Sequence, residues 1–217
     1  MRRRAWLMGV AGLVAHAAWG ETLPVPASGQ LAFEIWRKGD QIGTHTLTFV
    51  QTGDKLVVTI AVRIAIYFGP IRLFNYRMDG VEQWQDGQIA HIHTVTNDNG
   101  SHAHMRADMG AAGFAVQGNG TAPYMAPPHA LPATHWNHAE LDGPWINPQN
   151  GKLLRPHVTP LGEESVTTAG GGTATGRHYR VSGDVALDLW YDTNQRWLAL
   201  SFAGKDGSEI RYLRRDV

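Results

Sequence analysis

The sequence predicts an all-β protein whose single curved antiparallel sheet forms an open barrel or half-barrel. Three observations predict this fold: apolar side chains alternate along several segments, turn signals recur at short intervals, and no stretch has a convincing helical period. Many short strands joined by tight turns are typical of sandwiches and barrels. From the spacing of the turns, we expect roughly ten to twelve antiparallel strands.

The clearest strand runs from Leu56 to Tyr67. All of its even-numbered residues are large and apolar, namely Leu56, Val58, Ile60, Val62, Ile64 and Ile66. Because side chains alternate between the two faces of a strand, these residues predict one continuous buried face. A strand of this length extends roughly 40 Å and twists along its path, which predicts strong curvature of the sheet.

Further strands are expected on both sides of this segment, each ending at a turn signal. They cover residues 31–35, 44–50, 71–76, 81–84, 89–96, 114–117, 185–191, 198–202 and 210–212, with one more through His102 and His104. Asp79-Gly80 is interpreted as a turn between two of them, and residues 97–100 as a hairpin turn. The last three strands form a predicted meander.

Residues 121–148 interrupt the alternating pattern. This segment contains six prolines and shows no alternation. It predicts a long proline-rich loop that carries at most a short helix, around Thr134 to Leu141, with Thr134 as its N-cap. Loops of this length are uncommon in compact domains and are often functional.

The first 20 residues have the composition of an export signal. Three arginines precede an apolar run, and small residues follow up to Ala18-Trp19-Gly20. The apolar run is shorter than the roughly 20 residues that a membrane-spanning helix needs. We therefore expect residues 1–20 to be a cleaved signal peptide and residues 21–217 to form a single β domain. The mature protein is expected to be periplasmic or secreted, with membrane contact only through the signal segment before cleavage.

The composition excludes several classes of function. The chain has no cysteine, which removes disulfides, thiol nucleophiles and cysteine-ligated metal clusters. The chain has 19 basic residues (lysine and arginine) and 19 acidic residues (aspartate and glutamate). This balance argues against nucleic acid as a partner. Neither a phosphate-binding loop, nor a dinucleotide fingerprint, nor a serine-hydrolase elbow is present in the sequence. Nothing in the pattern indicates an oligomeric state.

Five segments carry a resemblance to a known family. They are residues 97–100, 134–137, 147–152, 183–192 and 206–210, of which Asp188-Leu189-Trp190-Tyr191-Asp192 is the most specific. Their order and spacing resemble the domain-of-unknown-function family 6134, a set of exported proteobacterial β-rich proteins. The resemblance implies a single exported β domain and supplies no catalytic residue. Read by itself, Asp188 could act as a general acid or pair with Arg196 or Arg211.

Four histidines flank the predicted hairpin turn at residues 97–100: His91, His93, His102 and His104. If the loop has an even length, opposite positions sum to an odd number such as 195 or 197, and all four rings share one face. They could then hold zinc, iron or copper. If the loop has three residues and a glycine bulge, the two pairs lie on opposite faces. The alternative interpretation is a solvated hairpin without a metal.

The proline-rich loop offers a second group of possible metal ligands. His135 and His138 would be neighbours on a helix, with Glu140 and Asp142 close by. Two imidazoles and one carboxylate suit zinc or non-haem iron, although the spacing matches no defined motif. The alternative is that Trp136 anchors the loop to the sheet and the histidines serve as hydrogen-bonding groups.

The main functional expectation is non-enzymatic binding of a lipid-like small molecule in a cavity formed by the curved sheet. The candidate ligand-binding residues are aromatic and basic: Tyr67, Phe74, Tyr76, Trp84, Trp136, Arg63 and Arg77. No cofactor is expected on this interpretation. The alternatives are a metal-dependent enzyme or metal-binding protein that uses the histidines above, and an assembly partner in the cell envelope.

Overall fold

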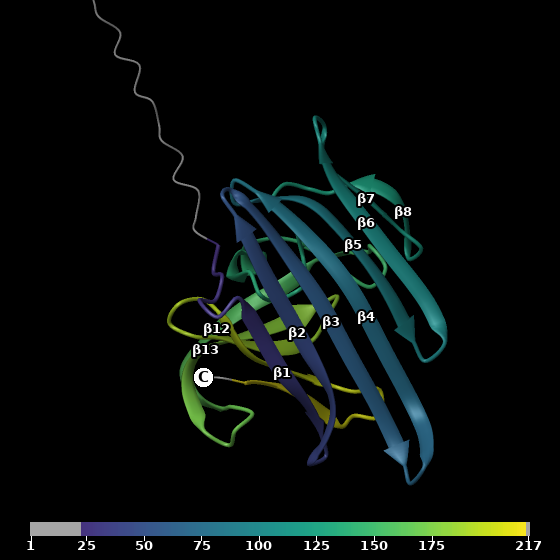
Figure 1. Cartoon of the computed structure of the whole chain (residues 1–217), viewed down its shortest axis with the longest axis vertical. Helices are drawn as coiled ribbons and strands as arrows, with labels where there is room; N and C mark the ends of the chain where they lie inside the picture. The colour runs from purple at the N-terminus through teal and green to yellow at the C-terminus, as the bar shows by residue number, and fades with distance from the viewer. Residues whose placement is uncertain (1–22, 216–217) are drawn as a thin grey trace, which may run out of the picture.

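The structure is a computed structural model that describes residues 23–215, so the predicted signal peptide lies outside the described residues (Figure 1). Its main element is one antiparallel sheet of 13 strands, in the order β12-β13-β14-β15-β16-β1-β2-β3-β4-β5-β6-β7-β8. The strand β1 pairs with β16, so the first and last strands of the chain lie side by side within the sheet. Over residues 23–215, no helix is long and apolar enough to cross a membrane.

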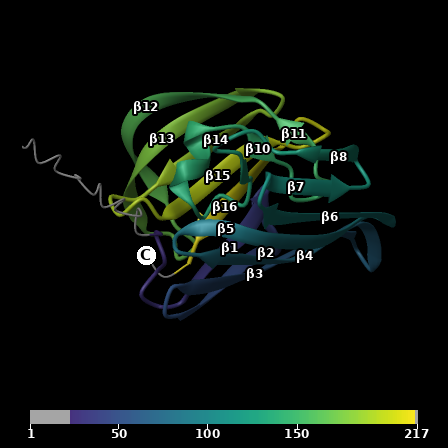
Figure 2. The ribbon, with the colours of Figure 1, turned by 90° about the horizontal axis from the view of Figure 1, so that it is seen from above.

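The strands of this sheet have the following bounds: β1 (Gln30–Arg37), β2 (Asp40–Thr52), β3 (Lys55–Phe68), β4 (Ile71–Gln85), β5 (Gln88–Asp98), β6 (Ser101–Gly110), β7 (Gly113–Gly118), β8 (Thr121–Met125), β12 (Pro156–Thr167), β13 (Thr173–Gly183), β14 (Leu187–Tyr191), β15 (Trp197–Ala203) and β16 (Glu209–Arg214). Successive strands form hairpins, and the predicted meander is β14, β15 and β16. Viewed from above, β12–β16 curl over to face β1–β6, and the sheet is not closed into a barrel (Figure 2). The predicted open half-barrel is confirmed.

Residues 126–155 lie inside the curve of the sheet, and we call this segment the plug. It contains three short strands of a separate sheet, β9 (Leu131–Pro132), β10 (Trp145–Ile146) and β11 (Leu153–Leu154), and the 3-10 helix η1 (His138–Asp142). The short helix is therefore confirmed, but its N-cap is Asn137, whose side chain accepts a hydrogen bond from the Ala139 N–H. The predicted N-cap Thr134 is used elsewhere, because its hydroxyl donates to Glu82 Oε1 over 2.7 Å.

The core lies between the plug and the inner face of the sheet. Trp136, Trp145 and Ile146 of the plug are almost completely buried. The ring of Trp136 packs edge-on against Phe49 of β2 and Trp84 of β4, with centroids 5.3 and 5.2 Å away. Burial of large aromatic side chains contributes most to such a core, about 25 cal/mol for each Å² of apolar surface removed from water.

The sheet differs from the expected strand pattern in three places. Residues 121–125, predicted as the start of the proline-rich loop, form the edge strand β8. Residues 71–85 form one continuous strand, because Gly80 lies in extended pairing between Ile60 and Thr94 rather than in a turn. A side chain there would collide with Thr94, whose Cγ2 lies 2.9 Å from the position of a Cβ, so glycine allows close packing instead of a bend. The hairpin of β12 and β13 was not predicted, since most residues of β12 are exposed and give no apolar alternation.

Candidate functional site

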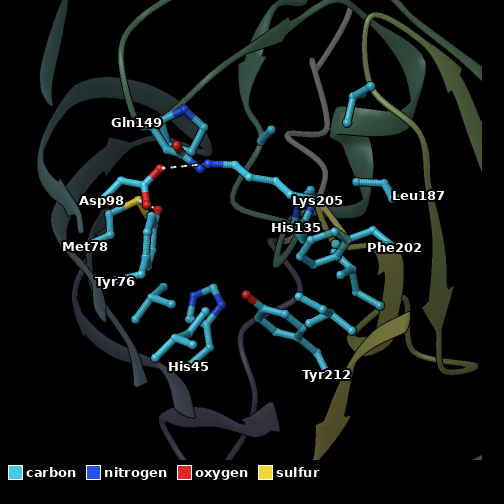
Figure 3. A pocket seen from close by; sticks show the side chains of 18 of the residues that line it. His45, Tyr76, Met78, Asp98, His135, Gln149, Leu187, Phe202, Lys205 and Tyr212 are labelled. Atoms are coloured by element: carbon cyan, nitrogen blue, oxygen red, sulfur yellow. Dashed lines mark hydrogen bonds and ion pairs between the residues drawn. The ribbon is translucent and has the colours of Figure 1, made fainter. Parts of the chain in front are cut away.

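The plug fills only part of the concave face, and a cavity of about 730 Å³ occupies the rest (Figure 3). The inner face of β3 shows the division. Leu56, Val58 and Ile60 are buried in the core, whereas Ile64 and Ile66, further along the same face, are only partly buried and line the cavity. One continuous apolar stripe therefore serves as core at one end and as cavity wall at the other.

The opposite wall of the cavity comes from the C-terminal meander. Leu200, Phe202 and Ile210 contribute apolar side chains from β15 and β16, and Trp145 closes the inner end from the plug. In Figure 3, Tyr76 and Met78 lie across the cavity from Phe202 and Tyr212. The cavity is within the roughly 300–1,000 Å³ range of small-molecule sites and is walled mainly by apolar groups.

His45 of β2 is the most unusual group in this wall. Its side chain is buried beside the rings of Trp197 and Tyr212, with centroids 5.2 and 5.9 Å away, and its Nε2 has no hydrogen-bond partner. Burial in these apolar surroundings, with a smaller contribution from His135, lowers the pKa of His45 to about 3. The imidazole is therefore neutral across the physiological pH range.

Two tyrosines of the wall are also neutral. Burial raises the pKa of Tyr212 and of Tyr76 well above the usual tyrosine value. The Tyr76 hydroxyl donates to the sulfur of Met78 over 3.7 Å. The interior of the cavity therefore presents weak, uncharged hydrogen-bonding groups within an apolar surface.

Charged side chains lie at one end of the cavity, which we call the mouth, next to the β1–β2, β5–β6 and β15–β16 turns. Arg37 and Lys38 both contact Asp206, at 2.6 and 3.2 Å. Lys205 lies 3.9 Å from Asp98, an ion pair drawn as a dashed line in Figure 3. The charges therefore border the opening, in contact with water, and not the interior.

A buried hydrogen-bond network fixes the plug next to the cavity. The backbone N–H of His135 donates to Glu140 over 3.0 Å, and His135 Nδ1 lies 2.6 Å from the other carboxylate oxygen. The Tyr191 hydroxyl of β14 donates to the same carboxylate over 3.3 Å, and Trp145 Nε1 donates to the Glu140 carbonyl over 2.6 Å. This network links the plug to the meander and holds the ring of His135 at the cavity wall.

The candidate aromatic residues are divided between three locations. Phe74 and Tyr76 line the cavity. Trp84 of β4 and Trp136 of the plug are buried in the core and do not line the cavity. Both indoles donate to the buried carboxylate of Glu82. Tyr67 lies at the end of β3 and is 59% exposed.

The two candidate arginines are not at the mouth. Arg63 and Arg77 are directly opposite each other on the outer face of β3 and β4, and both bind Asp79. Since the strand periodicity places odd-numbered residues of β3 outside, these side chains point away from the cavity. The charged groups of the mouth come instead from strand ends and turns, among them Arg37, Asp98 and Lys205.

The four histidines of the hairpin lie on one outer face, as an even-numbered loop predicts. The two-residue loop is Asn99-Gly100, both with positive φ, and opposite positions sum to 199 rather than to 195 or 197. In this register His93 lies opposite Arg106 and His104 opposite Val95. No two of the four rings, His91, His93, His102 and His104, are therefore directly opposite each other.

His135 and His138 point to different neighbours. His135 contacts Glu140, whereas His138 Nε2 lies 3.1 Å from the Tyr179 hydroxyl. Asp188 pairs with His178 and Arg180, at 2.7 and 3.1 Å, and not with the two arginines considered for it. Within residues 23–215, no three histidine or acidic side chains are grouped closely enough to hold a metal ion.

Sequence reasoning missed His45 and Glu82. Both carried a detectable signal, because each is a polar residue two positions before a large apolar residue on the same face: His45 before Leu47, and Glu82 before Trp84. Burial raises the pKa of Glu82, although three hydrogen-bond donors oppose that effect. A polar residue in such a position indicates a buried polar contact.

Comparison with known proteins identifies a family and a fold. The family model described as "Domain of unknown function (DUF6134)" matches residues 33–215. No curated protein matches the sequence. Among solved structures, a beta-barrel-like protein of domain of unknown function DUF1849 from Brucella abortus has a TM-score of 0.57 at 6% sequence identity, with 86% of this chain and 95% of that chain covered. This likeness shows a shared fold and nothing about activity.

Proposed function

Because this chain belongs to the DUF6134 family, whose description names no activity, we propose a function from the geometry of the site: non-enzymatic binding of an apolar or amphipathic small molecule in the cavity. The proposal rests on one observation. The inner face of β3 continues past the plug into a cavity of about 730 Å³ whose walls are mainly apolar. Leaving such a surface in contact with water is unfavourable, and a bound apolar molecule would cover it.

The polar groups of the interior favour a ligand without charge on its buried part. His45 is neutral, and Tyr76 and Tyr212 hold their protons. A carboxylate or an ammonium group would lose its hydration there without gaining an opposite charge. A long-chain alcohol or ketone fits better, since its one polar atom could reach a hydrogen-bonding group in the wall.

We place this activity outside the cytoplasm. Support comes from residues 1–20, whose arginines, apolar run and small residues have the order of a cleaved export signal. The absence of cysteine means that no disulfide stabilises the exported fold.

Two measurements test the proposal. Native mass spectrometry of protein recovered from its own cell envelope should show an added mass that organic extraction removes. Titration of the extracted protein with N-phenyl-1-naphthylamine, an uncharged fluorescent probe, should saturate at one probe per protein and be reversed by a long-chain alcohol. Protein that is consistently free of ligand and also fails to bind the probe contradicts the proposal.

A further inference from the structure

An exposed apolar cluster lies at the turn between β3 and β4, on both sides of Gly69-Pro70. We call it the tip patch, and it consists of Tyr67, Phe68, Ile71 and Leu73, which are 59%, 74%, 61% and 58% exposed. Of the ten exposed large apolar side chains in the described part of the chain, these four fall within seven consecutive residues. Single apolar residues on a surface are ordinary, whereas a contiguous group indicates an interaction site.

The tip patch is continuous with the mouth of the cavity. Leu73 belongs to the patch and also lines the cavity, and Ile66 and Phe74 continue the wall inward from there. In Figure 1 the β3–β4 turn lies at the same end of the sheet as the β1–β2 turn. A surface that covers the patch would therefore also cover the opening.

The charge around the tip patch indicates which kind of partner surface the patch can bind. Between Lys55 and Met78 the chain contains no aspartate or glutamate, and Arg63 and Arg77 in this range are paired with Asp79. Arg72 lies within the patch, is exposed and has no ion pair with any described residue. Aromatic and aliphatic side chains next to arginine are the combination that binds at the interface of an anionic membrane.

We propose that the tip patch inserts into an anionic phospholipid bilayer, so that the mouth of the cavity opens against the membrane. This inference rests on the proposed function, because it supplies the route by which an apolar ligand enters the cavity without crossing water. Phe68 and Ile71 enter the apolar layer, and Arg72 contacts phosphate groups. The β3–β4 pairing, which continues to Phe68 and Ile71, presents these side chains without any change of fold.

The absence of cysteine allows a direct test with a single label. Phe68→Cys, carrying a fluorophore that brightens in apolar surroundings, is compared with Leu161→Cys on β12, which replaces a side chain that is 47% exposed. With vesicles of phosphatidylglycerol and phosphatidylcholine, fluorescence should rise and shift to the blue for the tip label only. Vesicles of phosphatidylcholine alone should give a weaker response, and Arg72→Gln should weaken binding to anionic vesicles about fivefold.

A second pair of variants tests whether the patch itself carries the binding. Phe68→Ser with Ile71→Ser should reduce the vesicle partition coefficient about a hundredfold or more. Val50→Ser with Leu161→Ser removes two exposed apolar side chains elsewhere and should leave it unchanged. Both double variants should bind N-phenyl-1-naphthylamine in solution like the unmodified protein.

Three results would overturn the inference. One is equal vesicle binding by the two double variants, and another is equal brightening of the two labels. The third is self-association that the tip variant abolishes in the absence of lipid, which would make the patch an interface between copies of the chain. If vesicles bind through the tip but the probe does not bind in solution, the proposed function fails and the membrane contact remains.

Discussion

Trp84 of β4 and Trp136 of the plug donate their indole N–H groups to the same oxygen of Glu82, each over 2.9 Å. The two rings meet edge to face with their centroids 5.2 Å apart. A residue of the sheet and a residue of the plug are thereby joined through one buried carboxylate. This connection fixes how far the plug extends into the half-barrel, and so how much of the concave face remains as a cavity.

The Glu82 carboxylate should be required for stability through its hydrogen-bond acceptors. Glu82→Leu leaves two indole N–H groups and the Thr134 hydroxyl without a partner, and should lower the free energy of unfolding by about 3 kcal/mol or more. Glu82→Gln keeps an acceptor for the indoles and can donate to Thr134, so its effect at acidic pH should be small. Denaturant unfolding of the two variants measures the difference, and equal stabilities would contradict this role.

The Glu82→Gln variant also tests whether Glu82 is protonated in the folded protein. Burial raises the pKa of this carboxyl in the folded protein above its ordinary value of 4.5. Above about pH 4.5, the folded state therefore holds a proton that the unfolded chain has released. Protonated Glu82 contributes fully to the free energy of unfolding below about pH 4.5, and this contribution is lost as the pH rises. Glu82→Gln cannot titrate, so its stability relative to the unmodified protein should increase with pH above about 4.5. A constant difference would show an unshifted pKa.

Filling the cavity should weaken ligand binding without unfolding the protein. Ile64→Trp places a large side chain on the cavity wall of β3, and should weaken binding of N-phenyl-1-naphthylamine at least about tenfold. Val57→Trp is the matched control, because Val57 lies on the outer face of the same strand and is 36% exposed. Fluorescence titration and thermal unfolding of both variants check this prediction. Equal loss of binding in the two would exclude this cavity as the site.

His45 should make the protein sensitive to acid. Its pKa is lowered from 6.5 to about 3 in the folded state, so the unfolded chain binds a proton first as the pH falls. Above about pH 6.5, His45 is neutral in both states and does not reduce the free energy of unfolding. Between about pH 6.5 and pH 3, that free energy falls by at most about 1.4 kcal/mol per pH unit. His45→Phe should therefore unfold less steeply with acid than the unmodified protein. Parallel stability curves would contradict the assignment.

Gly43 of β2 should not tolerate a side chain. A Cβ at this position would lie 2.1 Å from the carbonyl oxygen of Arg63 and 2.9 Å from Ile64 Cα, both backbone atoms of β3. Gly43→Ala should force the two strands apart and cost about 1–3 kcal/mol. Gly110→Ala, where the nearest atom is 3.9 Å away, is the control and should fold normally. Thermal unfolding of the two variants distinguishes them.

The fold was predictable because β3, one of the longest strands, has large apolar residues along one face. The even-numbered residues from Leu56 to Ile66 do point inward, and their length implies the curvature that produces a half-barrel. Periodicity cannot say what covers that face, however. Leu56 is packed under the plug and Ile64 lines the cavity, although the pattern treats them alike.

The candidate site was harder to predict, because it depends on contacts between distant strands. Arg63 and Arg77 were predicted to bind the ligand, but the pairing of β3 with β4 places them together on the outer face with Asp79. The cavity is completed by Phe202 and Tyr212, which adjoin the N-terminal strands only because β16 pairs with β1. Whether the hairpin histidines lie opposite one another depends on the register of β5 and β6. His93 lies opposite Arg106, two residues beyond His104.

The most direct measurement is the position of a bound chain inside the protein. Crystals grown with a bromine-labelled long-chain alcohol should show an anomalous bromine signal between Ile64 of β3 and Ile210 of β16, with the plug in place beside it. A cavity that stays free of the alcohol, or bromine found only on the outer surface, would contradict the account.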